Sequence, residues 1–156
     1  MISFADRRII VSRILLIDGI LLIVVAFIHL LSTLPLKSWL ARELTPEFLA
    51  SVSPPFLLNH LVVGVLLIPF GVSTLYCAAG VRVGQWWTRV IAMTNALAIL
   101  VLPILLIALI GPEYYNAKPF LVASILITVI GFSMIVPLVW LWNDTSTIHH
   151  HEHHHL

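Results

Sequence analysis

Four long stretches of apolar residues constrain this chain more than any other feature. Each stretch has about the 20 residues that an α-helix needs to cross the hydrocarbon core of a bilayer. Their apolar residues are continuous rather than alternating, which favours helices over the strands of a membrane barrel. The predicted spans are residues 14–34, 55–79, 88–110 and 120–142.

The connections between these spans predict how the helices are arranged. Residues 80–87 and 111–119 form short connectors, so consecutive helices are expected to be antiparallel neighbours. We therefore predict an all-α integral membrane protein, an antiparallel bundle of four transmembrane helices forming a single domain over residues 1–156. Composition agrees, because only 10% of the residues are charged, against about 25% in soluble domains. The net charge of +1 argues against nucleic acid as a partner.

Lysine and arginine residues on the two sides of the spans predict the orientation. The side that includes the N-terminus carries five: Arg7, Arg8, Arg13, Arg82 and Arg89. The other side carries three: Lys37, Arg42 and Lys118. The positive-inside rule places the more basic side in the cytoplasm. We therefore expect a multi-pass protein of the cell membrane with both termini cytoplasmic.

Residues 35–54 form the one long connector, on the predicted outer side. The motif Thr45-Pro46-Glu47 resembles a helix start, since proline favours the first helical position. Before it, apolar residues recur at the spacing of an amphipathic helix that lies in the membrane interface: Leu36, Trp39, Leu40 and Leu44. We expect this segment to cover the bundle, either as a lid or as a gate over an outward-opening cavity.

His29 and His60 are candidates for cofactor binding. Both fall within roughly 10 Å of the outer hydrocarbon boundary, given the helical rise of 1.5 Å per residue. Two neutral imidazoles at one level on adjacent helices can ligate a haem, a chlorin or a metal ion. The alternative is a structural role, in which the rings bond to backbone carbonyls, lipid headgroups or each other.

Asp18 is the only carboxylate inside a predicted span. An ionised side chain is costly in lipid, so such residues face the protein interior and find partners. Polar residues at similar depth on the second and third helices predict a polar membrane layer formed by Asp18, Ser73, Tyr76 and Asn95. We expect Asp18 to bond to the second or third helix, with Arg13 as a further charge partner. The layer would be either a structural clasp or a proton or substrate relay.

The C-terminal tail, residues 143–156, is rich in histidine and predicted to be cytoplasmic. Imidazoles bind Zn, Ni and Cu ions readily, even without a fixed geometry. The candidate metal ligands are His149, His150, His151, His153, His154 and His155. The tail is either a native metal-binding segment or a modified purification tag.

The layout of the chain is similar to the four-helix fold of the sigma-2 receptor and emopamil-binding protein family. The shared features are the long outer segment and four residues within the spans: His29, Pro69, Pro103 and Pro137. The resemblance implies a sterol or amine ligand and, in some members, isomerase chemistry. That family uses acidic residues at membrane level, and the second span of this chain has none.

These observations predict a function without visible catalytic machinery. The sequence has no P-loop, no Gly-x-Ser-x-Gly motif and no His-Glu-x-x-His motif. The expected function is a small non-catalytic subunit of a larger membrane complex, in contact with lipid and other subunits, that binds a haem or chlorin through His29 and His60. The alternatives are a lipid- or sterol-binding membrane protein and a metal-handling protein that uses its tail.

Overall fold

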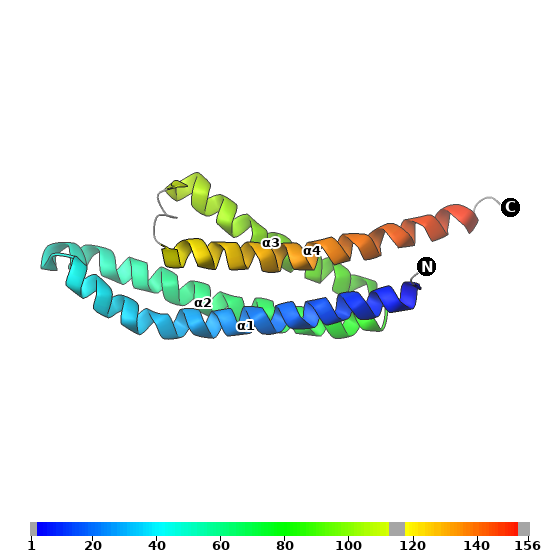
Figure 1. The fold of residues 1–156 in the computed structure, drawn as a ribbon, viewed down its shortest axis with the longest axis horizontal. Helices are drawn as coiled ribbons and strands as arrows, with labels where there is room; N and C mark the ends of the chain where they lie inside the picture. Colours follow the sequence, from blue (N-terminus) through cyan, green and yellow to red (C-terminus); the bar gives the residue numbers. More distant parts are fainter. Residues whose placement is uncertain (1–2, 113–117, 153–156) are drawn as a thin grey trace. The chain divides into compact units, whose positions relative to one another are not determined.

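The chain folds into four long helices (Figure 1). The structure is a computed structural model that describes residues 3–112 and 118–152, except for the side chains of residues 110, 119 and 143–152. Each helix contains a segment long and apolar enough to cross a membrane. The prediction of four apolar helices is confirmed. They are α1 (Phe4–Glu43), α2 (Pro46–Arg82), α3 (Trp86–Ile110) and α4 (Lys118–Glu152).

Local sequence signals fix several helix ends. Before α1, the Ser3 hydroxyl accepts the Asp6 backbone N–H at 3.1 Å and donates to the Asp6 carboxylate at 2.6 Å, which satisfies a first-turn donor. Pro46 opens α2, as predicted, and Thr45 accepts the Leu49 N–H at 2.8 Å. Gly111 ends α3 with a φ of 98°, a backbone conformation that glycine adopts without steric cost.

The connector between the first two spans differs from the prediction of a separate interfacial helix. Residues 35–43 continue α1 and residues 46–54 already belong to α2, so only Leu44 and Thr45 interrupt the helices. A helix can continue through Pro35 at the loss of one backbone hydrogen bond. Burial of Leu40, which is 5% exposed, stabilises the extension. The segment therefore forms no helix separate from α1 and α2. Its position at the membrane interface stays a prediction.

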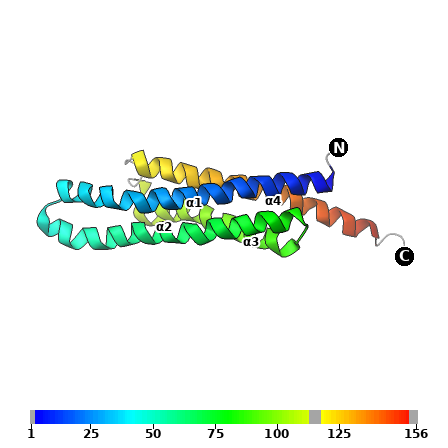
Figure 2. The same cartoon turned by 90° about the horizontal axis from the view of Figure 1, so that it is seen from below.

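The chain divides into two compact units whose boundaries fall inside α1 and α2. Unit 1 comprises Met1–Asp18 and Ser73–Leu156, and unit 2 comprises Gly19–Val72. Unit 2 is a helical hairpin of the α1 and α2 segments, which lie side by side in both views (Figures 1 and 2). We call residues 19–72 the α1–α2 hairpin.

Two glycines bring the helices of the α1–α2 hairpin into close contact. A Cβ atom at Gly71 would lie 2.9 Å from the Gly19 carbonyl oxygen and 2.6 Å from Ile23 Cγ1. A Cβ atom at Gly64 would lie 2.7 Å from Leu30 Cδ2. Small residues allow this backbone approach in membrane helices. The buried Leu22, Ala26 and Leu67 complete the contact face.

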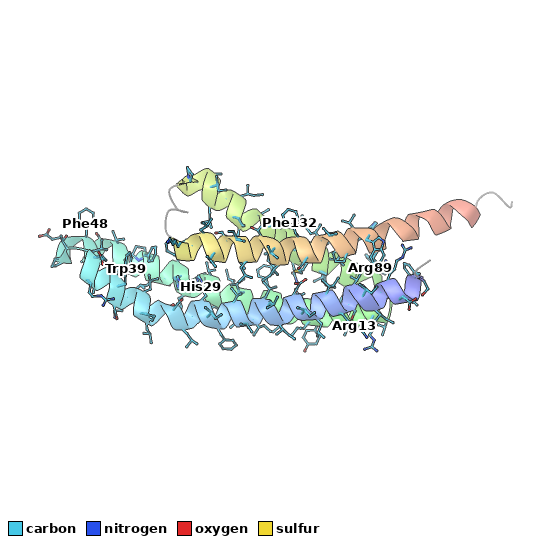
Figure 3. All side chains as sticks on the ribbon, in the orientation of Figure 1. Arg13, His29, Trp39, Phe48, Arg89 and Phe132 are labelled. Atoms are coloured by element: carbon cyan, nitrogen blue, oxygen red, sulfur yellow. The ribbon has the colours of Figure 1, made fainter. Side chains whose placement is uncertain are left out.

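Unit 1 packs small and large apolar residues from all four helices. On α3 the buried Ala92, Ala96 and Ile99 follow helical spacing. On α4 the buried residues are Ile127, Ile130, Met134, Leu138 and Leu141. Gly131 of α4 receives Leu100 of α3, because a Cβ atom there would lie 2.6 Å from the Leu100 side chain. Outside this core, large apolar side chains such as Phe132 of α4 point away from the helices (Figure 3), as expected where lipid is the solvent.

Candidate functional site

The α1–α2 hairpin places the two membrane histidines in direct contact. His29 of α1 and His60 of α2 are half-buried and their rings stack, with centroids 3.7 Å apart and planes inclined by 12°. The structure therefore brings together the two residues that sequence spacing places at one depth. Their contact is a stack of the two ring faces, while the hydrogen-bond partner of the His60 ring is Thr33. A role of the pair in cofactor binding stays a prediction.

Thr33, one turn beyond His29, fixes the orientation of the His60 ring. Its Oγ1 lies 3.0 Å from His60 Nδ1 and donates to the His29 carbonyl oxygen at 3.2 Å. A hydroxyl has one proton to donate. When that proton bonds to the carbonyl, His60 carries its own proton on Nδ1 and donates it to Thr33. The unprotonated Nε2 of His60 is then the basic nitrogen of the ring.

The stacked arrangement determines how these imidazoles can bind a cofactor. Two axial ligands of a haem point their nitrogen lone pairs at the iron from opposite sides of the macrocycle. Rings in face-to-face contact at 3.7 Å leave no layer between them for a macrocycle, and their lone pairs lie in nearly parallel planes. Ligation of one tetrapyrrole by His29 and His60 together therefore requires the rings to separate. Within the described residues, no group of three or more His, Cys, Asp or Glu side chains is placed to hold a metal ion.

The polar residues predicted to form a membrane layer lie in two separate hydrogen-bonded groups of unit 1, one of three residues and one of two. Asn95 Nδ2 of α3 donates to Ser73 Oγ of α2 at 3.0 Å and to Thr74 Oγ1 at 3.3 Å. Asp18 is 3% exposed, and its Oδ1 accepts the Ser133 hydroxyl at 2.7 Å. The expected partner of Asp18 on the second or third helix was wrong, because Ser133 lies on α4.

Tyr76, assigned to the layer, and Arg13, expected as a charge partner of Asp18, both point elsewhere. Tyr76 is 74% exposed, since it follows the buried Thr74 by two residues and so lies about 200° around α2. Arg13 is exposed and points outward from α1 (Figure 3), so it does not reach Asp18. The second carboxylate oxygen of Asp18 is buried without a hydrogen-bond partner in the described part of the chain.

Sequence reasoning missed a cluster at the end of unit 1 that contains Arg8 and Arg89. Both arginines were used only to count charges, yet both lie over the Phe4 ring, and Arg89 is 7% exposed. A signal for this burial exists in the sequence. Arg89 precedes Ala92 by three residues and Ala96 by seven, which places it on the small-residue face of α3.

The predicted metal ligands of the tail, His149 to His151 and His153 to His155, lie outside the side chains that the structure describes. Only the backbone of α4, to Glu152, is described there. The prediction of a metal-binding tail stays a prediction.

Comparison of the chain with protein-family models, with curated proteins and with solved structures finds no match.

Proposed function

We propose that the four helices form an antiparallel bundle with both termini in the cytoplasm, and that the protein is a small non-catalytic subunit of a larger membrane complex. The orientation is supported by the excess of basic residues on the side of the N-terminus. The subunit role is supported by one polar side chain on the lipid-facing surface of the α1–α2 hairpin.

Asn59 carries this proposal. It is exposed and precedes His60, so it shares the level of the stacked His29, five residues before the predicted end of the first span. Five residues correspond to about 7.5 Å of helix. The Asn59 amide is therefore presented to the hydrocarbon region, where it makes no hydrogen bond to any residue that the structure describes.

A neighbouring transmembrane helix is the partner that this amide needs. Hydrocarbon offers no donor or acceptor, so an exposed amide in lipid is costly. Asparagine side chains bond across helix interfaces in membranes, each contributing about 0.6–2 kcal/mol. We infer that a helix of another subunit, carrying a hydrogen-bonding group at this level, covers the face around Asn59.

The role of the histidines follows from the same placement. In the stacked state His29 and His60 hold the hairpin together at the level of Asn59. Binding of a haem or chlorin through both residues is the second state, and it requires the stack to open. Retention of a lipid or sterol by the purified protein would instead favour the lipid-binding alternative.

The proposal is tested by the size of the assembly extracted from its own membrane in a mild detergent. We expect the wild-type chain to migrate in a native gel with a larger complex, and the Asn59→Ala variant to be partly released from it. Leu61→Ala is the matched control, because Leu61 is exposed on α2 about 200° away from Asn59. Migration of the wild type as a single chain, or no difference between Asn59→Ala and Leu61→Ala, would refute the subunit role.

A further inference from the structure

Two arginines from different helices lie over the same aromatic ring at one end of unit 1. The guanidinium carbon of Arg8, on α1, is 5.2 Å from the Phe4 ring centroid. That of Arg89, on the first turns of α3, is 5.7 Å from the same centroid. The ring attracts both cations through its electron-rich face, but it offers no acceptor along the N–H directions of either guanidinium.

Each of these arginines has one buried N–H donor without a hydrogen-bond partner within the described part of the chain. Arg89 is 7% exposed, and its Nε is buried without a hydrogen-bond partner there. The Nε of Arg8 is also buried and also has no hydrogen-bond partner there. A guanidinium carries five N–H donors and cannot lose its charge in a protein. A buried cation is costly unless an anion accompanies it.

Like charges accumulate at this position. Arg8 and Arg89 lie over the same Phe4 ring, and no described carboxylate forms an ion pair with either residue. The N-terminus of α3 adds to the positive potential, because Gln85 at the cap has no side-chain hydrogen bond to the first-turn N–H groups. Three sources of positive potential thus converge where an anion would be stabilised.

The turn between α2 and α3 holds Arg8 in place. A Cβ atom built at Gly84 would collide with Arg8 Nη1, so the guanidinium lies against the bare backbone of the turn. Gly84 has a φ of 86°, a conformation that other residues rarely adopt. The site is therefore positioned by the fold and does not depend on a flexible surface side chain.

We propose that Arg8 and Arg89 together bind one phosphate group, and that its source is the headgroup of an anionic phospholipid. The planar fork of a guanidinium matches phosphate oxygens with two parallel hydrogen bonds, and a helix N-terminus favours the same anion. The lipid source is favoured by the neighbouring Trp86 and Trp87, which are 71% and 47% exposed. Exposed tryptophans at a span end mark headgroup depth.

Native mass spectrometry of the full chain, released from vesicles of phosphatidylcholine with phosphatidylglycerol, tests this site. We expect wild-type protein to retain one phosphatidylglycerol in preference to phosphatidylcholine. Arg8→Gln and Arg89→Gln should each weaken this retention by about tenfold or more, the effect of losing a charge-assisted bond. Arg82→Gln is the matched control, because Arg82 is exposed in the last turn of α2 in the same unit, and it should retain lipid like the wild type.

Other outcomes overturn the proposal in distinguishable ways. Equal retention by Arg89→Gln and the wild type would remove the phosphate site. Thermal stabilisation of lipid-free wild type by inorganic phosphate, lost in Arg89→Gln and without any preference for phosphatidylglycerol, would overturn the lipid source. Arg89→Lys keeps the charge and serves if Arg89→Gln does not elute as folded protein. Lipid retention by Arg89→Lys should fall below that of the wild type. Undiminished retention would refute the role of the planar guanidinium in binding the phosphate.

Discussion

His29 and His60 form a face-to-face pair, 3.7 Å between ring centroids, that joins α1 to α2 within the α1–α2 hairpin. The Thr33 hydroxyl, 3.0 Å from His60 Nδ1, fixes one ring and belongs to the same helix as the other. The same two imidazoles that pack the helices together are also good ligands for a metal ion or a haem. Experiments can distinguish a structural role of this histidine pair, in which it holds α1 against α2, from a role in binding a cofactor.

Replacement of His60 by Ala should destabilise the folded state by about 1–2 kcal/mol, because it removes an aromatic pair and a hydrogen bond. Thr33→Val, which removes the hydrogen bond and leaves the stack, should cost less. Equilibrium unfolding in detergent measures both. Leu61→Ala controls for the loss of an exposed apolar side chain. An equal loss of unfolding free energy in Leu61→Ala and His60→Ala would contradict a stabilising role of the histidine pair.

Purified protein should show no visible absorption band if the stacked pair is its resting state, because a macrocycle has no space between the rings. Absorption spectroscopy of protein purified from its own membrane, with metal analysis of the tail-truncated chain, measures this. A band that disappears or shifts in both His29→Ala and His60→Ala, with unchanged chromatographic behaviour, would show instead that the pair opens to hold a tetrapyrrole.

Ser133→Ala should cost about 1–3 kcal/mol, because it removes the hydrogen bond that Ser133 gives to the buried Asp18 carboxylate. In an Asp18→Ala background the same substitution should cost much less, since the interaction is already absent. Unfolding measurements on the four proteins of this cycle give the coupling. Thr128→Val is the control, because the Thr128 hydroxyl bonds to the Ser124 carbonyl of its own helix at 2.7 Å. Equal costs of Ser133→Ala in both backgrounds would disprove the pairing.

Gly71→Ala should destabilise the α1–α2 hairpin more than Gly64→Ala. A Cβ atom at Gly71 meets the Gly19 carbonyl oxygen, which belongs to the backbone, whereas one at Gly64 meets the flexible end of Leu30. By helix propensity alone, each substitution would stabilise by about 1 kcal/mol, so the sign of the change is informative. Unfolding free energies of the two variants and the wild type show whether each substitution stabilises or destabilises the hairpin. Stabilisation by Gly71→Ala would show that the helices are not in close contact at this position.

The proposed orientation predicts which cysteines react from outside intact cells. With the buried Cys77 replaced by Ala, a membrane-impermeant maleimide should label cysteines introduced at Lys37 and Ser51. A cysteine introduced at Gln85 should be protected until the cells are opened. All three native residues are exposed in the structure, so differences in labelling report the side of the membrane. The reverse pattern would invert the topology and leave the four helices intact.

All four helices were predictable from the sequence, but only some of the side-chain partners were. Continuous apolar runs and the Thr45-Pro46 start depend on local sequence, so they identified all four helices and the first residue of α2. The continuation of α1 past Pro35 depends on the burial of Leu40, which is a property of packing. In sequence, a proline after an apolar run looks the same whether the helix ends or continues.

For the polar residues, the sequence predicts the depth of a side chain along its helix but not the direction in which it points. Sequence spacing gave the common level of His29 and His60, and the bond between Asn95 and Ser73 also follows from depth. The partner of Asp18 depends on which helix faces it, and spacing along one chain does not specify that. Tyr76 was assigned by depth alone, although its angular position on α2 directs it away from the core.

Only Leu44 and Thr45 join the two helices of the α1–α2 hairpin. The number of residues between this junction and His60 therefore determines whether His60 faces His29. Each residue added or removed within a helix turns everything beyond it by about 100°. A single deletion between Pro46 and Asn59 would rotate His60 off His29, while α1 and its side chains remained unaltered. Inherited variation in this region should therefore consist of substitutions, with insertions and deletions confined to the junction itself.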